Sequence, residues 1–266
     1  MSQINNAMEI FRFLNKSNCR KCNEATCLAF AAAVFKGTKR IGACPDLDPE
    51  IIARYNGQMK NPKPPEAEAD EAIAELKNKV RTVDLAQAAR RLDGRYGNGK
   101  LTLKILGKDF GIDTMGNIFT DIHVHGWVAL PVLTYILEGK GTQLSNNWVP
   151  LRELAGGKDW YRLFGQRCEK PLKKLADTHT DLFEIVVDLF SGHHVEQQFD
   201  SDISVVLHPL PRVPILISYW KPEDGLESDL HLFFDDTAED QLNMDAIYTL
   251  GTGLTVMFEK IAQRHA

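Results

Sequence analysis

Four of the five cysteines lie between positions 19 and 44, and their spacing restricts the chain more than any other feature. Cys19, Cys22 and Cys27 lie close together, whereas Cys44 follows after sixteen intervening residues and is directly followed by Pro45. Three thiolates from one tight loop and a remote fourth before a proline are typical of a chain that wraps an iron–sulfur cluster. We therefore predict that Cys19, Cys22, Cys27 and Cys44 ligate one [4Fe-4S] cluster.

The residues around the third cysteine predict a helix. From Thr26 onward, residues 28–35 are apolar and rich in alanine, and Gly37 is a suitable residue to end a helix. Cys27 would then lie in the first turn. A helix N-terminus carries partial positive charge, which favours a thiolate and an anionic cluster.

Structural zinc binding and disulfide formation are the alternative uses of these cysteines. Structural zinc usually pairs two C-x2-C knuckles, or two cysteines with two histidines, and no histidine precedes His123. Disulfides would require an oxidising compartment. The fifth cysteine, Cys168, has basic neighbours at Arg167 and Lys170, so it is either a reactive thiol of low pKa or an ordinary thiol; with no histidine close in sequence, we favour the ordinary thiol.

The stretch from residue 8 to 57 resembles a small [4Fe-4S] domain of anaerobic redox proteins. The resemblance lies in the four cysteines, Pro45 and the helix CLAFAAAV. Proteins with such a domain include the large subunit of the corrinoid iron–sulfur protein and the B subunit of Rnf-type complexes. The resemblance implies single-electron transfer, to cobalt in the first case and along a chain of clusters in the second. Arg20, Lys21 and Asn23 stand where such domains often have glycines, which puts the geometry of the turn in doubt.

Charge is distributed unevenly along the chain. Residues 1–62 have nine Lys and Arg against five acidic residues, whereas the rest of the chain has 22 against 31. Basic residues near an anionic cluster lower the cost of the extra negative charge on reduction. A nucleic-acid interface is the alternative, but the aromatic residues of single-strand binders are not interleaved. The basic residues in question are Arg20, Lys21, Lys36, Lys39 and Arg40.

The composition predicts two domains. Residues 1–57 form the cluster domain, with further helices over 7–14 and 49–55; residues 58–70 form a proline-rich linker; residues 71–266 form the second domain. The linker either lets the first domain swing toward a partner or lies as an ordered strap.

The second domain should be α+β with a mostly antiparallel sheet, because its helical and strand patterns come in separate runs. The expected helices cover 71–92, 127–137, the region from 158 to 176, 180–190 and 237–264. The expected strands are 100–106, two within 110–119, 204–208, 213–219 and 229–234, and a turn region covers 148–157.

Three stretches of the second domain resemble the domain family of unknown function DUF3786. They are WVPLRELAGG at 148–157 with Trp160 and Tyr161 after it, LPRVP at 210–214 with Tyr219 and Trp220, and HLFFDD at 231–236. This resemblance implies a fold family and no established activity.

Other residues of the second domain suggest chemistry only weakly. Asp121, His123 and Gly126 match the D-x-H-x-x-G pattern of corrinoid-binding loops, but the surrounding pattern favours a plain loop before a buried helix. His123 and His125, with His193 and His194, could share a metal ion. Asp235 and Asp236 are interpreted as a helix N-cap.

Together these patterns predict a [4Fe-4S] redox protein of an anaerobe that transfers single electrons, with reductive activation of a corrinoid protein as the role that the resemblance implies. The expected partner is a redox protein, either a ferredoxin-like donor or a corrinoid protein, with no nucleic acid and no membrane span. The N-terminus lacks the basic and apolar regions of a signal peptide, which predicts a cytoplasmic location. The alternatives are a regulatory or binding protein with a structural or redox-sensing cluster, and an enzyme whose site lies in a pocket near His123 and His125.

Overall fold

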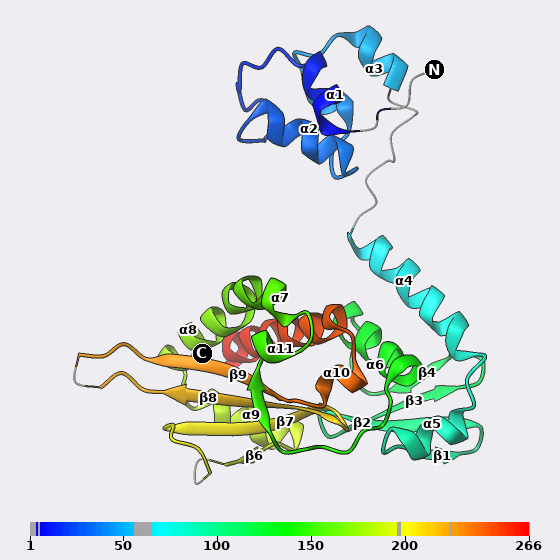
Figure 1. The fold of residues 1–266 in the computed structure, drawn as a ribbon, viewed down its shortest axis with the longest axis vertical. Coiled ribbons are helices and arrows are strands. Elements are labelled where there is room, and N and C mark those ends of the chain that lie inside the picture. The colour runs from blue at the N-terminus through cyan, green and yellow to red at the C-terminus, as the bar shows by residue number, and fades with distance from the viewer. Residues whose placement is uncertain (1–3, 5, 56–64, 196–197, 224, 266) are drawn as a thin grey trace. The chain divides into compact units, whose positions relative to one another are not determined.

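The chain forms two compact units, Met1–Asp70 and Glu71–Ala266, each described here by itself (Figure 1). A computed structural model describes residues 4, 6–55, 65–195, 198–223 and 225–265. Of the predicted linker 58–70, residues 58–64 lie outside the described residues, and residues 65–70 form the start of helix α4 (Pro65–Val80).

The first unit is helical, and its helices begin where the sequence predicts. Three side chains cap them: Asn6 accepts from the Glu9 N–H, Thr26 from the Ala29 N–H, and Asp48 from the Glu50 N–H. The elements are α1 (Ala7–Phe13), α2 (Cys27–Phe35), the 3-10 turn η1 (Ile41–Ala43) and α3 (Pro49–Tyr55).

The core of this unit contains cysteine as well as aliphatic and aromatic side chains. Cys27 and Cys44 are buried in it, and Cys22 packs against it. The other buried members are Ile10, Leu14, Phe30, Ala31, Val34, Ile41, Leu47 and Tyr55. The core is small because the unit is short. Domains of this size often rely on a cofactor for part of their stability.

The second unit contains two sheets in which all neighbouring strands are antiparallel. The four-stranded sheet has the order β1-β2-β3-β4, and the five-stranded sheet has the order β5-β9-β8-β7-β6. A hydrogen bond from the Leu106 N–H to the His208 carbonyl joins them. The strands are β1 (Arg95–Gly97), β2 (Lys100–Ile105), β3 (Lys108–Asp113), β4 (Ile118–Thr120), β5 (Trp148–Pro150), β6 (His193–His194), β7 (Ile203–Leu210), β8 (Val213–Trp220) and β9 (Asp229–Asp235).

Helices in separate runs complete the α+β fold and confirm the predicted class. They are α4 (Pro65–Val80), α5 (Leu85–Arg91), α6 (Gly126–Glu138), the 3-10 turn η2 (Leu151–Glu153), α7 (Gly157–Phe164), the π-helical turn η3 (Gly165–Glu169), α8 (Lys170–Thr178), α9 (Leu182–Phe190), α10 (Ala238–Gln241) and α11 (Met244–His265). In Figure 1, α6, α7, α8 and α11 lie on the same side of the five-stranded sheet.

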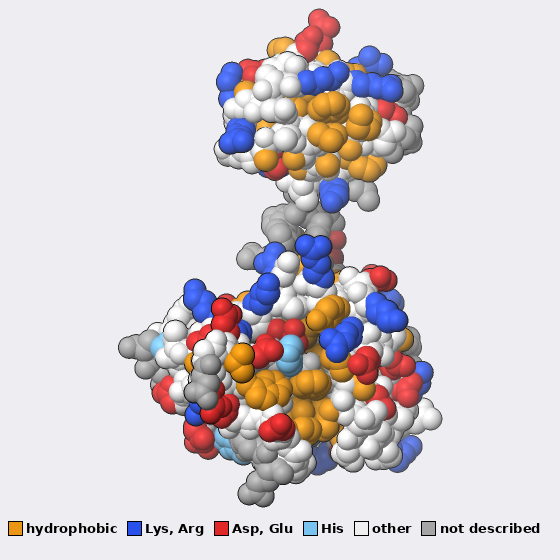
Figure 2. Space-filling view, turned by 60° about the vertical axis from the view of Figure 1, so that its left-hand side comes forward, with side chains coloured by type: hydrophobic (Ala, Val, Ile, Leu, Met, Phe, Trp, Pro, Cys, Tyr) orange, Lys and Arg blue, Asp and Glu red, His pale blue; other side chains and the backbone are white. Residues whose placement is uncertain are grey.

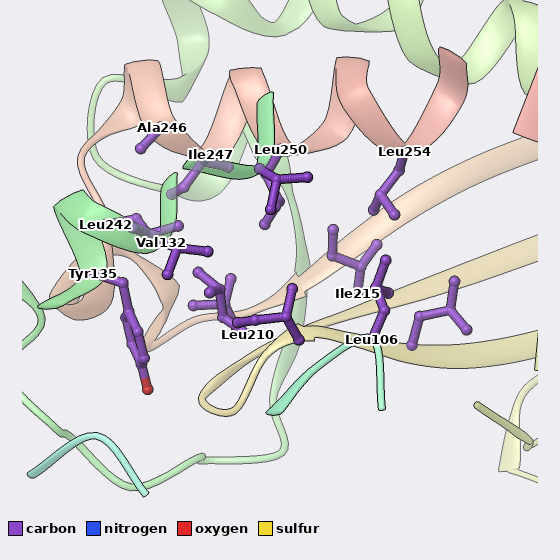
Figure 3. Close-up of a cluster of buried hydrophobic side chains, with 14 of the residues drawn as sticks. Leu106, Val132, Tyr135, Leu210, Ile215, Leu242, Ala246, Ile247, Leu250 and Leu254 are labelled. Atoms are coloured by element: carbon purple, nitrogen blue, oxygen red, sulfur yellow. The ribbon is translucent and has the colours of Figure 1, made fainter. Parts of the chain in front are cut away.

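The core of the second unit lies between α11 and this sheet. Figure 3 shows Leu250 and Leu254 of α11 pointing toward the strands, where Leu210 and Ile215 meet them. All four side chains are at most 3% exposed. Burial of such side chains is the main stabilising contribution to a domain of this kind.

The structure also corrects some expectations. Three short strands, β1, β5 and β6, were not predicted, and β5 lies in the expected turn region 148–157. Asp235 and Asp236 do not cap α10, because its N-cap is Thr237. Asp235 instead is 1% exposed and accepts hydrogen bonds from Ser145, Asn146 and Thr237.

Candidate iron–sulfur site

The loop that carries the first two cysteines turns sharply through left-handed backbone positions. Arg20 has φ of 61° and Asn23 has φ of 60°, and these residues directly follow Cys19 and Cys22. They are the positions where the resembling cluster domains often have glycine. Since glycine adopts positive φ without steric cost, the structure gives a reason for the glycines and shows that this chain makes the same turns without them.

Cys27 is held at the start of α2 by a reciprocal pair of hydrogen bonds. The Asn18 side-chain oxygen accepts from the Cys27 N–H at 2.8 Å, and the Asn18 N–H donates to the Cys27 Sγ at 3.4 Å. Cys27 is the first residue of the helix, as predicted. Its sulfur therefore lies where unpaired N–H groups and the helix dipole stabilise negative charge.

Cys44 is placed near the first loop although it is remote in sequence. Burial raises the pKa of the Cys44 thiol, a backbone hydrogen bond from Asp46 opposes this, and negative charge on Cys22, Asp46 and Cys19 raises the pKa further. Neighbouring thiols that raise one another's pKa in this way do not readily ionise together. A bound cation removes this obstacle, because metal ligation stabilises the deprotonated thiolates.

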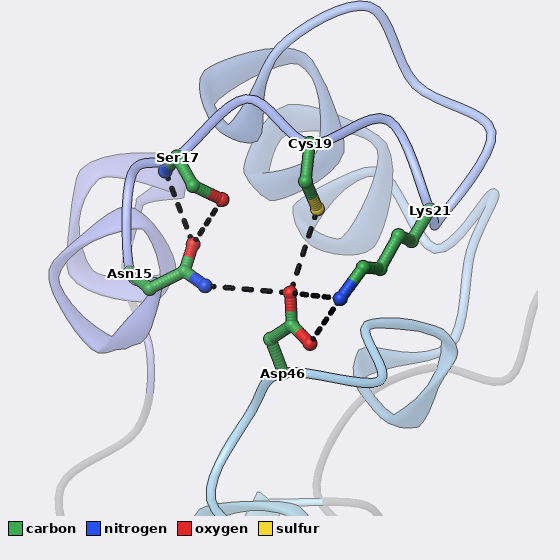
Figure 4. A network of polar contacts seen from close by, with 5 residues as sticks. All are labelled: Asn15, Ser17, Cys19, Lys21 and Asp46. Atoms are coloured by element: carbon green, nitrogen blue, oxygen red, sulfur yellow. Dashed lines mark hydrogen bonds and ion pairs between the residues drawn. The ribbon is translucent and has the colours of Figure 1, made fainter.

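Asp46 connects the two halves of the site. Figure 4 shows its carboxylate beneath the loop, where it accepts from Lys21 Nζ at 2.9 Å, from Asn15 Nδ2 at 3.5 Å and from the Cys19 thiol at 3.5 Å. Lys21 holds the pKa of the exposed Asp46 carboxyl below its usual range, chiefly through this hydrogen bond. Asn15 is fixed in turn, because its Oδ1 accepts from the N–H and the hydroxyl of Ser17.

A second lysine anchors the loop. Lys39 Nζ donates to the Cys22 carbonyl at 2.6 Å and pairs with Glu24 at 2.9 Å. Two of the basic residues named in the sequence, Lys21 and Lys39, thus lie beside the cysteines rather than on a separate face.

The four predicted ligands are all thiols, the ligand type that iron–sulfur clusters take. In the described part of the chain, no three His, Cys, Asp or Glu side chains form a group able to hold one metal ion. Structural zinc requires four ligands about 2.0–2.3 Å from one point. In an iron–sulfur cube each thiolate binds a different iron, so the sulfurs need not converge. All five cysteines are free thiols, which leaves the four available as ligands.

Cys168 is not part of this site. It is fully buried in the second unit, and burial raises its pKa to about 12. A thiol of such pKa is scarcely ionised near neutral pH, so the preferred interpretation as an ordinary thiol agrees with the structure.

The histidines of the second unit do not form a metal site among the described residues. His123 and His125 lie edge to face, with ring centroids 4.1 Å apart, in the segment before α6. His193 stacks on His208, and His194 pairs with Glu184. The D-x-H-x-x-G pattern therefore lies in a loop of an antiparallel fold, and not in the strand-to-helix turn of a parallel sheet that the corrinoid motif requires.

Comparison with known families confirms the resemblance of the second domain to DUF3786. A model described as "Domain of unknown function (DUF3786)" matches residues 84–257, which is more than half of the chain. The chain belongs to the DUF3786 family. Within this DUF3786 region the structure explains one quoted glycine: a Cβ at Gly157 would lie 1.8 Å from the Leu151 carbonyl oxygen, so no larger residue fits there.

The cysteine region has its own match and its own relatives. A model described as "Putative Fe-S cluster" matches residues 14–45, the range that includes all four cysteines. The acetyl-CoA decarbonylase/synthase complex subunit gamma of Methanothermobacter thermautotrophicus is 46% identical over 41 residues, and that of Methanosarcina acetivorans is 38% identical over 45. These stretches are 15% and 17% of this chain, and 9% and 10% of the relatives.

The chain thus spans about a tenth of the length of these curated relatives. No solved structure matches it. These findings support an iron–sulfur protein in which the cluster region is joined to a DUF3786 domain. None of the described helices combines the length and hydropathy that crossing a bilayer would require.

Proposed function

We propose that this protein carries one [4Fe-4S] cluster on Cys19, Cys22, Cys27 and Cys44 and transfers single electrons to a partner protein. The observation that carries the proposal is the surroundings of Cys44. Asp46, two residues after Cys44, accepts a hydrogen bond from the Cys19 thiol at 3.5 Å, so the segment that carries Cys44 lies against the first loop although 16 residues separate it from Cys27.

The chain's own residues would control the cluster in three ways. The Asn18 N–H donates to the sulfur of Cys27, and the Asp46 backbone donates to the sulfur of Cys44. Such hydrogen bonds offset the negative charge that reduction adds to a cluster. Lys21 and Lys39 place positive charge beside the loop. The apolar core that buries Cys27 and Cys44 limits access of water to that side. The cluster, when bound, supplies a one-electron redox couple.

The surface of the first unit suits a transient protein partner. Figure 2 shows hydrophobic side chains gathered on one face of this unit with Lys and Arg side chains around them. Its exposed large hydrophobic residues are Met8, Leu28 and Phe35. An apolar patch with a basic rim is suited to an acidic partner, because rim charges steer the encounter while the patch provides the contact.

The identity of the partner rests on similarity alone. The curated relatives are named as subunits of a complex, and the cysteine region resembles the domain that passes an electron to cobalt in corrinoid iron–sulfur proteins. We propose a ferredoxin-like donor and a corrinoid protein as acceptor, with the DUF3786 domain as the part that distinguishes this chain from those relatives.

Iron and sulfide analysis after oxygen-free purification tests the ligands. We expect about four irons and four sulfides per chain, lost in the single variants C19S, C22S, C27S and C44S and kept in C168A, the matched control. Retention of a full cluster in C44S would contradict the proposed ligand set.

Electrochemistry tests the role. A reversible one-electron signal at low potential, with rapid exchange to a ferredoxin, is the expected result. A cluster that is reduced only when the protein unfolds would instead support the alternative, a regulatory or binding protein with a structural cluster.

A further inference from the structure

The second unit contains a cavity of about 570 Å³ that no family description assigns. Its walls come from the β2–β3 hairpin, the segment before α6, α6 itself, α9 and α11. The apolar lining residues are Ile105, Leu106, Ile122, Trp127, Val128, Val132, Leu189, Phe190, Pro209, Leu250, Val256, Met257 and Ile261. This size and lining are those of a small-molecule site.

All charged side chains that line the cavity are of one sign. They are Lys108, Lys260 and Arg264, and no acidic residue is among the lining residues. This is unexpected in a domain whose stretch of sequence, residues 71–266, has 28 acidic residues against 21 Lys and Arg. Scattered surface charge would give a mixture of signs, so the cavity has a local field that attracts anions.

These cations are also free to bind a ligand. Across the described residues, none of the three takes part in an ion pair, whereas Lys104 and Lys140 of the same unit do. Lys260 and Arg264 stand four residues apart on α11, where like charges repel each other. A bound anion would remove this repulsion.

Two histidines complete the lining. The positive charge of Lys260 reaches the His125 ring, and burial, His123 and Lys260, in that order, lower the pKa of His125. His125 is thereby kept uncharged near neutral pH, so that it offers a ring nitrogen for a hydrogen bond beside the cations. The apolar floor consists of core residues: Leu106, Val132 and Leu250 are at most 5% exposed.

We propose that this cavity binds a small amphipathic anion, a carboxylate or phosphate ester with an apolar chain. The apolar body lies between α6, α9 and α11, and the anionic head is bound by Lys108, Lys260 and Arg264. The proposal is independent of the cluster, because every lining residue belongs to the second unit.

Binding of decanoate, decyl phosphate and decanol to the full chain, measured by calorimetry, tests this site. We expect both acids to bind and decanol to bind at least tenfold more weakly, about 1.4 kcal/mol. The comparison of decanoate with decyl phosphate identifies the head group. Inorganic phosphate alone should not bind, because it lacks the apolar chain.

Variants separate the two halves of the site. K260M and R264M should each weaken acid binding several-fold, with decanol unaffected, and V256W should weaken all three ligands by filling the cavity mouth. K174M, which removes a lysine that lines a different surface hollow on α8, should leave binding unchanged. Equal binding of decanol and the acids, acid binding unaltered in K260M and R264M, or no binding of either acid would each overturn the proposal.

Discussion

Asn18 and Cys27 are joined by two hydrogen bonds that run in opposite directions between a loop and a helix. The Asn18 side chain satisfies the Cys27 N–H, and the Asn18 N–H faces the Cys27 sulfur. Asn18 also has φ of 52°, a left-handed value that asparagine tolerates better than most residues. One residue therefore shapes the loop, pairs the first N–H of α2 and contacts a predicted ligand.

We predict that Asn18 contributes to cluster retention through both its side chain and its backbone conformation. N18G keeps the backbone conformation and loses the side-chain hydrogen bond to the Cys27 N–H, whereas N18A loses this bond and strains the backbone. We expect N18A to cost about 2 kcal/mol of unfolding free energy and N18G about 1, from the usual values for a lost hydrogen bond and for left-handed strain. Chemical denaturation of the cluster-loaded protein, together with the rate of iron release, measures this order; equal effects of the two would contradict it.

Glycine at the two left-handed turn positions should stabilise the first unit. R20G removes a β-carbon from a position with φ of 61°, so we expect a gain of up to about 1 kcal/mol, with a smaller gain for N23G because asparagine is at ease there. Ala25 is the matched control, since its φ is not positive and A25G should be destabilising. Thermal unfolding followed by the visible absorbance of the cluster measures all three. A loss of stability in R20G would show that the turn does not carry this strain.

Much of the fold follows from short-range patterns in the sequence. Alternation predicted β2, and the alanine-rich apolar run predicted α2, because these features depend on neighbours a few residues away. Strands β5 and β6 have only three and two residues, too few to show a period. They form because β9 and β7 offer hydrogen-bonding edges, which no local pattern shows.

The cysteine site and the cavity also differ in how much of each the sequence predicts. The cysteine spacing predicts the ligands, because the number of residues between ligands depends on how the chain wraps a cluster. The cations of the cavity could not be found from the sequence, since Lys108 and Arg264 are more than 150 positions apart and only the fold brings them to the lining of one cavity. Asp46 was likewise not singled out, although it follows Cys44 by two residues.

Gly253 should be irreplaceable in α11, contrary to ordinary helix propensity. A Cβ at this position would lie 2.3 Å from the Trp127 ring, so G253A must displace that ring. We expect a loss of about 1–3 kcal/mol, as for other overpacked cores, and weaker ligand binding because Trp127 lines the cavity. At Gly165, a Cβ would meet nothing closer than 3.4 Å, so G165A should be neutral or stabilising. Chemical denaturation of both variants decides between packing and propensity.

His231 and His208 should give the second unit opposite responses to pH. Glu169, followed by Asp229, raises the pKa of His231 against the effect of burial. Its contribution to stability is therefore fully present below its unfolded pKa of about 6.5 and is lost as the pH rises through the folded value. Burial, followed by His193, lowers the pKa of His208, so the unfolded chain takes up this proton first and stability is lost as the pH falls below about 6.5.

The two histidines can be separated by substitution. Relative to wild type, H231Q should be most destabilised at pH 5–6 and approach wild type at higher pH, whereas H208Q should gain relative stability as the pH falls. Unfolding free energies from urea titrations between pH 5 and pH 8.5 measure both slopes. Because the His231 side chain is 42% exposed, salt should reduce its effect more than that of the partly buried His208. Parallel pH profiles for H231Q and wild type would show that Glu169 does not hold the protonated ring.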